Sequence, residues 1–182
     1  PCQRPIDAGT LLDIGGGSTE LTRIANNVDE KNASMGLGSL SQFTSCVSGV
    51  LPKQKELDAM KALLKKQLAT VKNRKSYQSP QFFGIGGSLR GAVKVLTAMY
   101  GEKITGSPLE KELFTDFFKR YRANENEVAH LILKVIPERI HTLIPGCLIA
   151  YLLMEELGGK TLEVHRKGVR EGYLIERILS DT

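Results

Sequence analysis

Short runs with the alternating or wholly apolar pattern of strands dominate the first part of the chain. Residues 10–14 are apolar and end at three glycines, residues 19–24 alternate, and residues 31–36 follow a turn-forming pair of asparagines. A period of two is typical of strands, and glycine and asparagine between such runs favour tight turns. We therefore predict three strands with short connections and an antiparallel start to a sheet.

The rest of the chain combines helical periodicity with two further apolar runs. In residues 53–74 the side chains of Leu57, Met60 and Leu64 recur at helical spacing, which predicts an amphipathic helix. Further helices are predicted over residues 39–50, 89–99, 108–121, 125–134, 137–157 and 170–179, and further strands over residues 81–85 and 161–165. Ser88 is expected to cap the helix that follows it. This order predicts an α/β domain with a mixed central sheet covered by helices on both faces.

Length and composition fit one globular domain over residues 1–182. The chain is 41% hydrophobic and 25% charged, and its formal net charge of +5 suits an anionic partner. Its three cysteines have no CxxC spacing, so we expect no disulfide framework, no zinc site and a cytoplasmic location. The most apolar run, residues 143–154, is interrupted by Pro145 and Gly146 and is too short to span a bilayer, which argues against a membrane protein.

Two apolar runs end in the same way, with glycines followed by a serine. LLDIGGGS covers residues 11–18 and FFGIGGS covers residues 82–88. Glycine allows positive φ and lets a ligand approach the backbone N–H groups, and such groups at a helix start bind anions. We interpret the two clusters as phosphate-binding loops, formed by Gly15, Gly16, Gly17 and Ser18 and by Gly86, Gly87 and Ser88. Either cluster alone would also fit a tight turn.

Two carboxylates accompany the first glycine cluster. Asp13 lies inside the apolar run, where an unpaired charge is costly, whereas a carboxylate beside a phosphate loop can hold Mg²⁺ or another divalent cation. Glu20 lies across the loop and is a candidate general base that orients a water. A turn-capping role for Asp13 and an exposed strand position for Glu20 are the alternatives.

A basic segment also bears on the class of function. Its eight cations are Lys53, Lys55, Lys61, Lys65, Lys66, Lys72, Arg74 and Lys75. A row of cations suits a linear polyanion such as polyphosphate, and the alternative is the solvated face of an amphipathic helix. The sequence has no G-x-S-x-G elbow and no Walker-type phosphate loop, and its three histidines lack metal-ligand spacing. No sequence-specific nucleic-acid partner is indicated.

Four blocks of the sequence resemble the exopolyphosphatase/guanosine pentaphosphate phosphatase (Ppx/GppA) family. They are LLDIGGGSTEL at residues 11–21, GIGGSLRGAVKVL at residues 84–96, PERIHTLIPG at residues 137–146 and GVREGYL at residues 168–174. The resemblance implies a ribonuclease-H-like fold of the actin/Hsp70/sugar-kinase superfamily. It also implies a bacterial enzyme with two such halves around a cleft, of which this chain resembles the second, C-terminal half.

The resemblance implies roles for particular residues as well. It places a metal at Asp13, phosphate at the first glycine loop and a catalytic function at Glu20. Arg139 matches an arginine near the phosphates, and bracing of its own helix is the alternative. The family's principal catalytic glutamate lies upstream of the first block, whereas the twelve residues before Asp13 contain none, and the chain begins without Met. We therefore expect a missing N-terminal domain and little activity from this chain alone.

The leading functional hypothesis is hydrolysis of terminal phosphoanhydride bonds in inorganic polyphosphate or guanosine pentaphosphate, supported by Mg²⁺ or another divalent cation. A non-enzymatic module that binds polyphosphate or an alarmone is the first alternative. A kinase or ATPase of the wider superfamily is the second, although its longer adenosine-contacting glycine motif is not found. The choice between the two substrates and the existence of a homodimer are left open.

Overall fold

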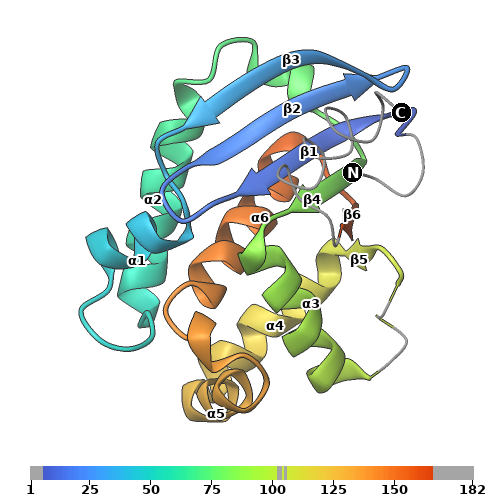
Figure 1. The fold of residues 1–182 in the computed structure, drawn as a ribbon. Coiled ribbons are helices and arrows are strands. Elements are labelled where there is room, and N and C mark those ends of the chain that lie inside the picture. The colour runs from blue at the N-terminus through green and yellow to red at the C-terminus, as the bar shows by residue number, and fades with distance from the viewer. Residues whose placement is uncertain (1–5, 102–103, 105, 166–182) are drawn as a thin grey trace, which may run out of the picture.

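A six-stranded mixed sheet forms the centre of the protein in the computed structural model, which describes residues 6–101, 104 and 106–165. Its strands are β1 (Ala8–Ile14), β2 (Thr19–Ala25), β3 (Val28–Met35), β4 (Gln81–Ile85), β5 (Leu109–Glu110) and β6 (Thr161–Val164). They lie in the order β3-β2-β1-β4-β6-β5 (Figure 1). β2 lies between β1 and β3 and is antiparallel to both, β4 and β6 run parallel to β1, and β5 is an antiparallel edge strand.

The predicted antiparallel start of the sheet is confirmed. Asn26 and Asn27 connect β2 to β3 with φ values of 52° and 61°. A two-residue hairpin turn with both residues in the left-handed region matches the twist of the strands, and asparagine tolerates that region. β3 begins at Val28, earlier than predicted, because its pairing with β2 extends to Val28 opposite Ala25.

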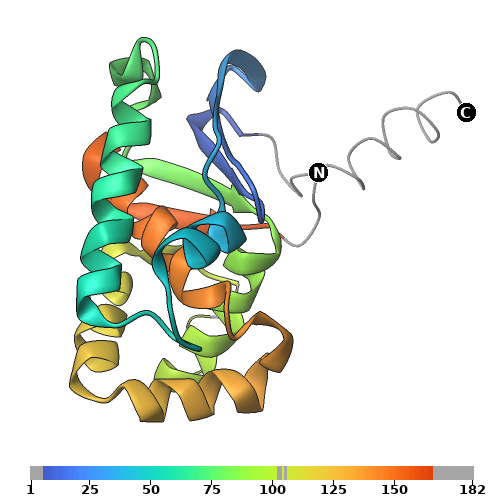
Figure 2. The ribbon, with the colours of Figure 1, turned by 90° about the vertical axis from the view of Figure 1, so that its left-hand side faces the viewer.

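Helices connect the strands and build the core. They are α1 (Ser39–Cys46), α2 (Gln54–Ala69), the 3₁₀ helix η1 (Arg74–Tyr77), α3 (Gly87–Tyr100), α4 (Lys111–Ala123), α5 (Glu125–Val135), the 3₁₀ helix η3 (Pro137–Arg139) and α6 (Leu143–Leu157). α6 is apolar on nearly every side and packs against α1, α2, α3 and α4, as expected for a central buried helix (Figure 2). Among the described residues, no helix has the length and apolar character needed to cross a membrane.

The described helices cover one face of the sheet. Leu12 of β1 belongs to the main core cluster, which these helices share. Its neighbour Leu11 packs instead with Ile24 and Phe83 in a separate cluster, because successive strand side chains alternate between faces. The crossovers from β1 to β4 and from β4 to β6 advance in the same direction, and right-handed connections then place their helices on the same face. The helix predicted over residues 170–179 lies outside the described residues.

Several helix boundaries differ from the prediction where the backbone changes direction. α1 ends at Cys46, not at residue 50, because Val47 is extended. α2 ends at Ala69, not at residue 74, and η1 then begins after Asn73, whose φ of 52° is left-handed. The helix predicted over residues 137–157 is divided into η3 and α6.

The predicted cap of α3 is wrong. The N-cap residue is Gly86, and Ser88 lies inside the first turn of the helix. Gly86 has a φ of 110°, a conformation that glycine adopts readily and other residues avoid. The chain therefore uses a glycine to turn from β4 into α3, which leaves the Ser88 side chain for another contact.

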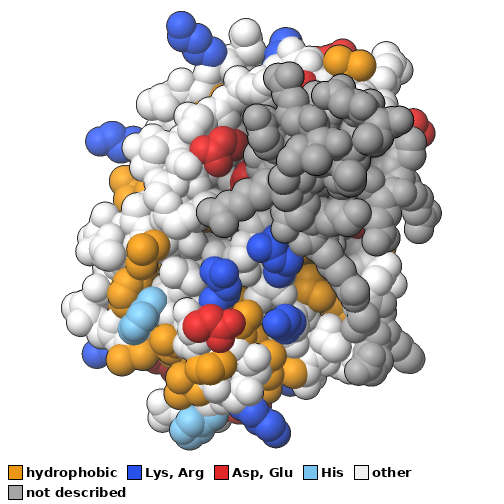
Figure 3. Space-filling model, in the orientation of Figure 1, with side chains coloured by type: hydrophobic (Ala, Val, Ile, Leu, Met, Phe, Trp, Pro, Cys, Tyr) orange, Lys and Arg blue, Asp and Glu red, His pale blue; other side chains and the backbone are white. Residues whose placement is uncertain are grey.

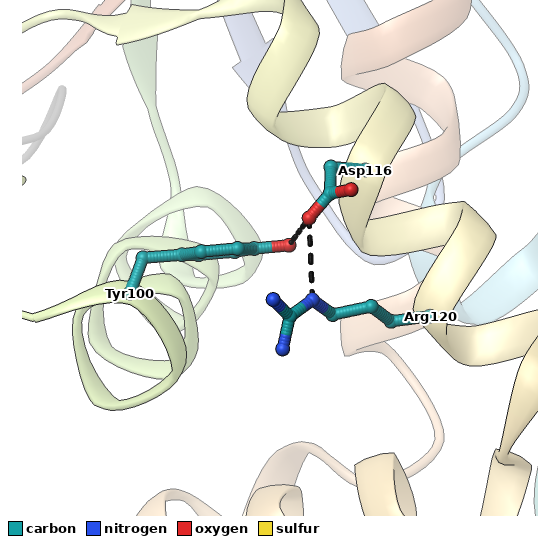
Figure 4. Close-up of polar contacts among 3 residues, drawn as sticks. All are labelled: Tyr100, Asp116 and Arg120. Carbon is teal, nitrogen blue, oxygen red and sulfur yellow. Dashed lines mark hydrogen bonds and ion pairs between the residues drawn. The ribbon is translucent and has the colours of Figure 1, made fainter.

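A polar cluster joins the far end of α3 to α4 (Figure 4). The Tyr100 hydroxyl donates to Oδ2 of Asp116 at 2.6 Å, and Nε of Arg120 donates to the same oxygen at 3.2 Å. The Arg120 guanidinium carbon lies 5.0 Å from the centre of the Tyr100 ring. The hydrogen bond from Tyr100, followed by the contacts with Arg120, lowers the pKa of Asp116. The Asp116 carboxylate thus accepts from both neighbours, and all three side chains have a partner within the cluster.

Candidate functional site

The two glycine loops meet at the carboxyl ends of β1 and β4. The strands are parallel neighbours, and Asp13 lies in register with Ile85. A methyl group built on Gly86 would lie 2.7 Å from the carbonyl oxygen of Ile14 and 3.4 Å from Oδ1 of Asp13. The second loop therefore packs directly against the end of β1, and glycine is required there both for its φ and for this close approach. The fold brings together two clusters that are far apart in the sequence.

The start of α1 holds the first loop in place through hydrogen bonds. The amide of Ser39 donates to the carbonyl oxygen of Gly15, and the amides of Leu40 and Ser41 donate to that of Gly16, all at 2.9 Å. These bonds occupy amides that a helix start otherwise leaves without partners. The loop carbonyls are thus turned towards α1.

The Gly15 amide donates to the carbonyl oxygen of Ser18, whereas the next three amides of the first loop have no acceptor among the described residues. Within the described part of the chain, the backbone N–H groups of Gly16, Gly17 and Ser18 donate no hydrogen bond. Consecutive free N–H groups beside glycines form a concavity that favours an anion. Phosphate binding by the amides of Gly16, Gly17 and Ser18 stays a prediction, and their lack of acceptors among the described residues is compatible with it.

Arg139 lies across the start of α3, at the second loop. A methyl group on Gly87 would lie 2.8 Å from Nη1 of Arg139, so the guanidinium rests on the glycine backbone. Arg90, one turn along α3, is close enough to Asp13 to oppose the rise in the pKa of that carboxyl. Figure 3 shows cationic side chains gathered over and beside α3, with an acidic side chain among them and others above, over the hairpin strands. The helix start and its cations together create a positive environment at the second loop.

The Ser88 side chain is directed into the protein. It is buried, and its hydroxyl donates to Oγ of Ser39 at 3.0 Å. The Ser39 hydroxyl in turn donates to the carbonyl oxygen of Gly15 at 3.1 Å. A methyl group on Gly146 of α6 would lie 2.5 Å from Cβ of Ser88, so that glycine makes room for the contact. The Ser88 hydroxyl is thus engaged in a contact inside the protein.

Sequence reasoning missed Ser39. Its amide and hydroxyl bond the first loop, and its hydroxyl accepts from the second, so one residue connects both loops. The sequence does contain a signal, because Gly38-Ser39 repeats the glycine–serine pattern in front of a helix. A methyl group on Gly38 would lie 2.6 Å from the carbonyl oxygens of Gly15 and Gly16, which explains the glycine at that position.

Asp13 and Glu20 form a carboxylate pair across β1 and β2. They are direct partners in the antiparallel register, so their side chains share one face of the sheet. Glu20 accepts a hydrogen bond of 3.2 Å from the Ser34 hydroxyl. Burial raises the pKa of Asp13, the Glu20 carboxylate raises it further, and Arg90 acts in the opposite direction. Asp13 is thus a half-buried carboxylate with a second carboxylate directly beside it.

This pair fits a divalent cation. Like charges on directly opposite strand positions repel, and a cation between them removes the repulsion. Mg²⁺ in phosphate-processing sites is commonly held by one or two carboxylates, with water and substrate oxygens completing its shell. The residues that the structure describes include no group of three His, Cys, Asp or Glu side chains placed to hold a metal. Any cation bound here would therefore depend on water and phosphate ligands.

The fold and this site define a class of protein. A hairpin followed by two parallel crossovers, with glycine loops at the strand ends, is the plan of a ribonuclease-H-like domain of the actin/Hsp70/sugar-kinase type. A profile of the Ppx/GppA phosphatase family matches residues 4–181. The chain belongs to this family.

Solved structures share the fold at low sequence identity. The Ppx/GppA family member of Aquifex aeolicus is 20% identical with a TM-score of 0.76, and the match covers 99% of this chain and 59% of that one. An exopolyphosphatase from Cytophaga hutchinsonii is 18% identical with a TM-score of 0.78, covering 97% and 59%. The chain therefore spans about three fifths of the length of these relatives. No curated protein matches the sequence significantly.

Proposed function

We propose that this chain is the phosphate- and metal-binding half of a phosphoanhydride hydrolase. Its substrates would be inorganic polyphosphate, guanosine pentaphosphate or both, from which the terminal phosphate is released to water. The observation that carries the proposal is the meeting of the two glycine loops beside Asp13, with Gly86 in contact with the end of β1. Membership of a phosphatase family agrees with it.

The glycine loops are proposed to hold the phosphates. The free amides of Gly16, Gly17 and Ser18 would bond one phosphate group, and the amides at the start of α3 would bond another. Arg139 would add a planar, charged donor at the second loop. In phosphoryl transfer, positioning and charge stabilisation supply most of the catalysis, and a preorganised set of donors provides both.

Asp13, with Glu20 beside it, is proposed to hold a divalent cation such as Mg²⁺ through its carboxylate. Such a cation neutralises charge that develops on phosphate oxygens. Glu20 would also orient a water, since its second oxygen is not used by Ser34. Burial, followed by the Glu20 carboxylate, raises the pKa of Asp13, and a bound cation would oppose both effects.

A second half is proposed to complete the site. This chain spans 59% of the Aquifex aeolicus structure that it resembles. The principal base and the opposite wall of the cleft would come from that further half. Groups that act as a unit fail together, so this chain alone is expected to bind phosphates without useful turnover.

One observation favours the non-enzymatic alternative. In the described residues the site has two carboxylates and no group of three metal-ligating side chains. The same loops would then sense polyphosphate or an alarmone without cleaving it. Binding alone does not separate the two proposals, so turnover must be measured.

Phosphate release decides between these functions. The longer protein proposed above is incubated with polyphosphate, with guanosine pentaphosphate, or with ATP and a sugar, with and without Mg²⁺, alongside an Asp13→Asn control. Mg²⁺-dependent release from polyphosphate or guanosine pentaphosphate that disappears in the control supports the hydrolase. Binding by calorimetry without release supports the regulatory module. Phosphate transfer to the sugar would contradict both.

A further inference from the structure

A second cationic surface lies at the other end of the hairpin from the glycine loops. An open groove of about 590 Å³ is lined by Lys31, Ala69, Asn73, Arg74, Lys75 and Ser76. We call it the β3–η1 groove. Its three cations come from two distant parts of the chain, β3 and η1. The fold, and not a local run of lysines, therefore assembles the surface.

Local structure fixes the position of η1 in this groove. Asn73, the residue before η1, takes a left-handed conformation from which η1 starts. The Thr10 hydroxyl of β1 donates to the carbonyl oxygen of Tyr77 at 2.8 Å, in a fully buried bond. Thr10 lies about 17 Å from Gly15 along an extended strand. The groove is thus anchored to the sheet and separate from the glycine loops.

Four cations at this end of the sheet form no ion pair within the part of the chain that the structure describes. Arg23 of β2 lies directly opposite Lys31 of β3. None of Arg23, Lys31, Arg74 and Lys75 forms an ion pair with another described residue. Like charges directly opposite on neighbouring strands are destabilising. A bound anion would relieve this repulsion.

The structure also revises which part of the basic segment faces a ligand. Lys61 pairs with Asp58 and Lys65 pairs with Glu156, so part of the α2 row is already neutralised within the protein. Arg74 and Lys75, at the end of the segment, are exposed and unpaired within the described residues. Four other cations of the segment, Lys53, Lys55, Lys66 and Lys72, likewise form no ion pair with a described residue. Of this segment, only Arg74 and Lys75 line the groove, where Lys31 joins them.

We propose that the β3–η1 groove binds a linear polyphosphate. An open groove with several cations suits a chain of repeated negative charges better than a compact ligand, because each neutralised phosphate releases counterions. Its lining contains no aromatic side chain, whereas surfaces for single-stranded nucleic acids stack bases on aromatic rings. The choice of polyphosphate among linear polyanions rests on the proposed function. The preference of the groove for anions rests only on its cations.

A charge reversal with a matched control tests the proposal. The variant Lys31→Glu/Arg74→Glu/Lys75→Glu is compared with Lys55→Glu/Arg122→Glu/Lys134→Glu, which changes two lysines and one arginine at exposed positions outside the groove. Calorimetry with long-chain polyphosphate at several salt concentrations gives the affinity. The groove variant should lose at least about tenfold in affinity, and its slope of log K against log salt should decrease by about 2, given roughly 0.7 per phosphate contact. The control should retain both.

Two further ligands make the outcomes distinct. Tripolyphosphate is expected to bind the glycine loops equally in both variants, and failure of the unmodified chain to bind it would count against the proposed function instead. Equal losses of long-chain binding in the groove variant and the control would show a general charge effect and overturn the groove. A single-stranded DNA oligonucleotide that binds the groove as tightly as polyphosphate would overturn the ligand assignment.

Discussion

The carboxylates near the two ends of α3 have pKa values shifted in opposite directions. At its start, Asp13 lies beside Glu20 and its pKa is raised, and several loop amides have no acceptor in the described residues. At its end, Asp116 accepts from Tyr100 and Arg120 and its pKa is lowered (Figure 4). One carboxylate is destabilised by its surroundings and the other is stabilised. Polar groups that lack hydrogen-bond or ionic partners within the protein are typical of a ligand-binding site, and among the described residues they occur at the start of α3.

Replacing Asp13 should have the largest effect of the substitutions considered, because it removes the carboxylate at the ligand-binding end of α3. In the longer protein, we predict that Asp13→Asn lowers turnover at least about 100-fold, as the loss of a key charge-stabilising group does. The fold should remain intact, since no hydrogen bond of the Asp13 side chain with another described residue is lost. Phosphate-release assays with a Mg²⁺ titration measure the effect. A near-normal rate with unchanged Mg²⁺ dependence would contradict the proposed role of Asp13 in metal binding.

The same variant makes a prediction about stability. A carboxyl with a raised pKa contributes stability in its protonated form, which is present at low pH and is lost as pH rises through the raised pKa. Asparagine is neutral throughout, so Asp13→Asn should be at least as stable as the unmodified chain at pH 7. The difference should disappear below the ordinary value of 3.8. Thermal unfolding at both pH values checks this, and a less stable variant at pH 7 would contradict it.

A methyl group at Gly87 should displace Arg139 without unfolding α3. Alanine is a good helix former and Gly87 has no positive φ, but its Cβ would meet the Arg139 guanidinium. We predict that Gly87→Ala weakens tripolyphosphate binding about tenfold or more, the effect of one charged hydrogen bond. Arg139→Ala should have a similar effect, and the double variant should be no weaker than either one, because both remove the same contact. Additive losses would show that Arg139 does not act at this loop.

Ser39 should affect both the loops and stability, but less strongly. Ser39→Ala removes the acceptor of the buried Ser88 hydroxyl, which we expect to cost about 1–3 kcal/mol of unfolding free energy. Tripolyphosphate affinity should decrease severalfold, because the first loop loses a bond at Gly15. Thr10→Val is the control, since it removes another buried hydroxyl bond at the far end of β1. If both variants reduce the affinity equally, Ser39 has no special role in placing the loops.

Local patterns were sufficient where one segment determines its own structure. The strand over residues 81–85 and the buried stripe of α2 follow from periodicity alone, and both are confirmed. The short strand β5 was missed, because two residues carry no periodic signal and its pairing with β6 is made by distant residues. The predicted end of α1 was wrong because Val47 is extended, which no periodic pattern indicates.

The sequence was enough to identify candidate residues of the site, but not the contacts between them. Asp13 and the glycine clusters were found because a charge in an apolar strand and repeated glycines are unusual in themselves. The bond between Ser88 and Ser39 joins residues 49 apart in the sequence, and no local pattern indicates it. The position of Arg139 on Gly87 likewise depends on how η3 packs against α3.

The smallest effect is predicted at the other end of α3. Tyr100→Phe removes the hydroxyl that bonds Asp116, so a small decrease in Tm is expected at pH 7 and tripolyphosphate affinity should not change. A carboxyl with a lowered pKa contributes stability above its ordinary value of 3.8, which is lost as pH falls through the lowered pKa. The difference in Tm between Tyr100→Phe and the unmodified chain should therefore shrink in acid, the opposite trend to that of Asp13→Asn.

Tyr121→Phe is the matched control for this prediction. Its hydroxyl donates to the carbonyl oxygen of Pro52 at 2.8 Å, and this acceptor does not titrate. The loss of Tm in Tyr121→Phe should thus persist at low pH, because the same kind of bond is removed without a carboxylate. If both tyrosine variants respond to pH alike, general acid destabilisation explains the trend and Asp116 has no special part in it. If Tyr100→Phe weakens tripolyphosphate binding, the two ends of α3 are coupled, and the separation between a structural end and a ligand-binding end is wrong.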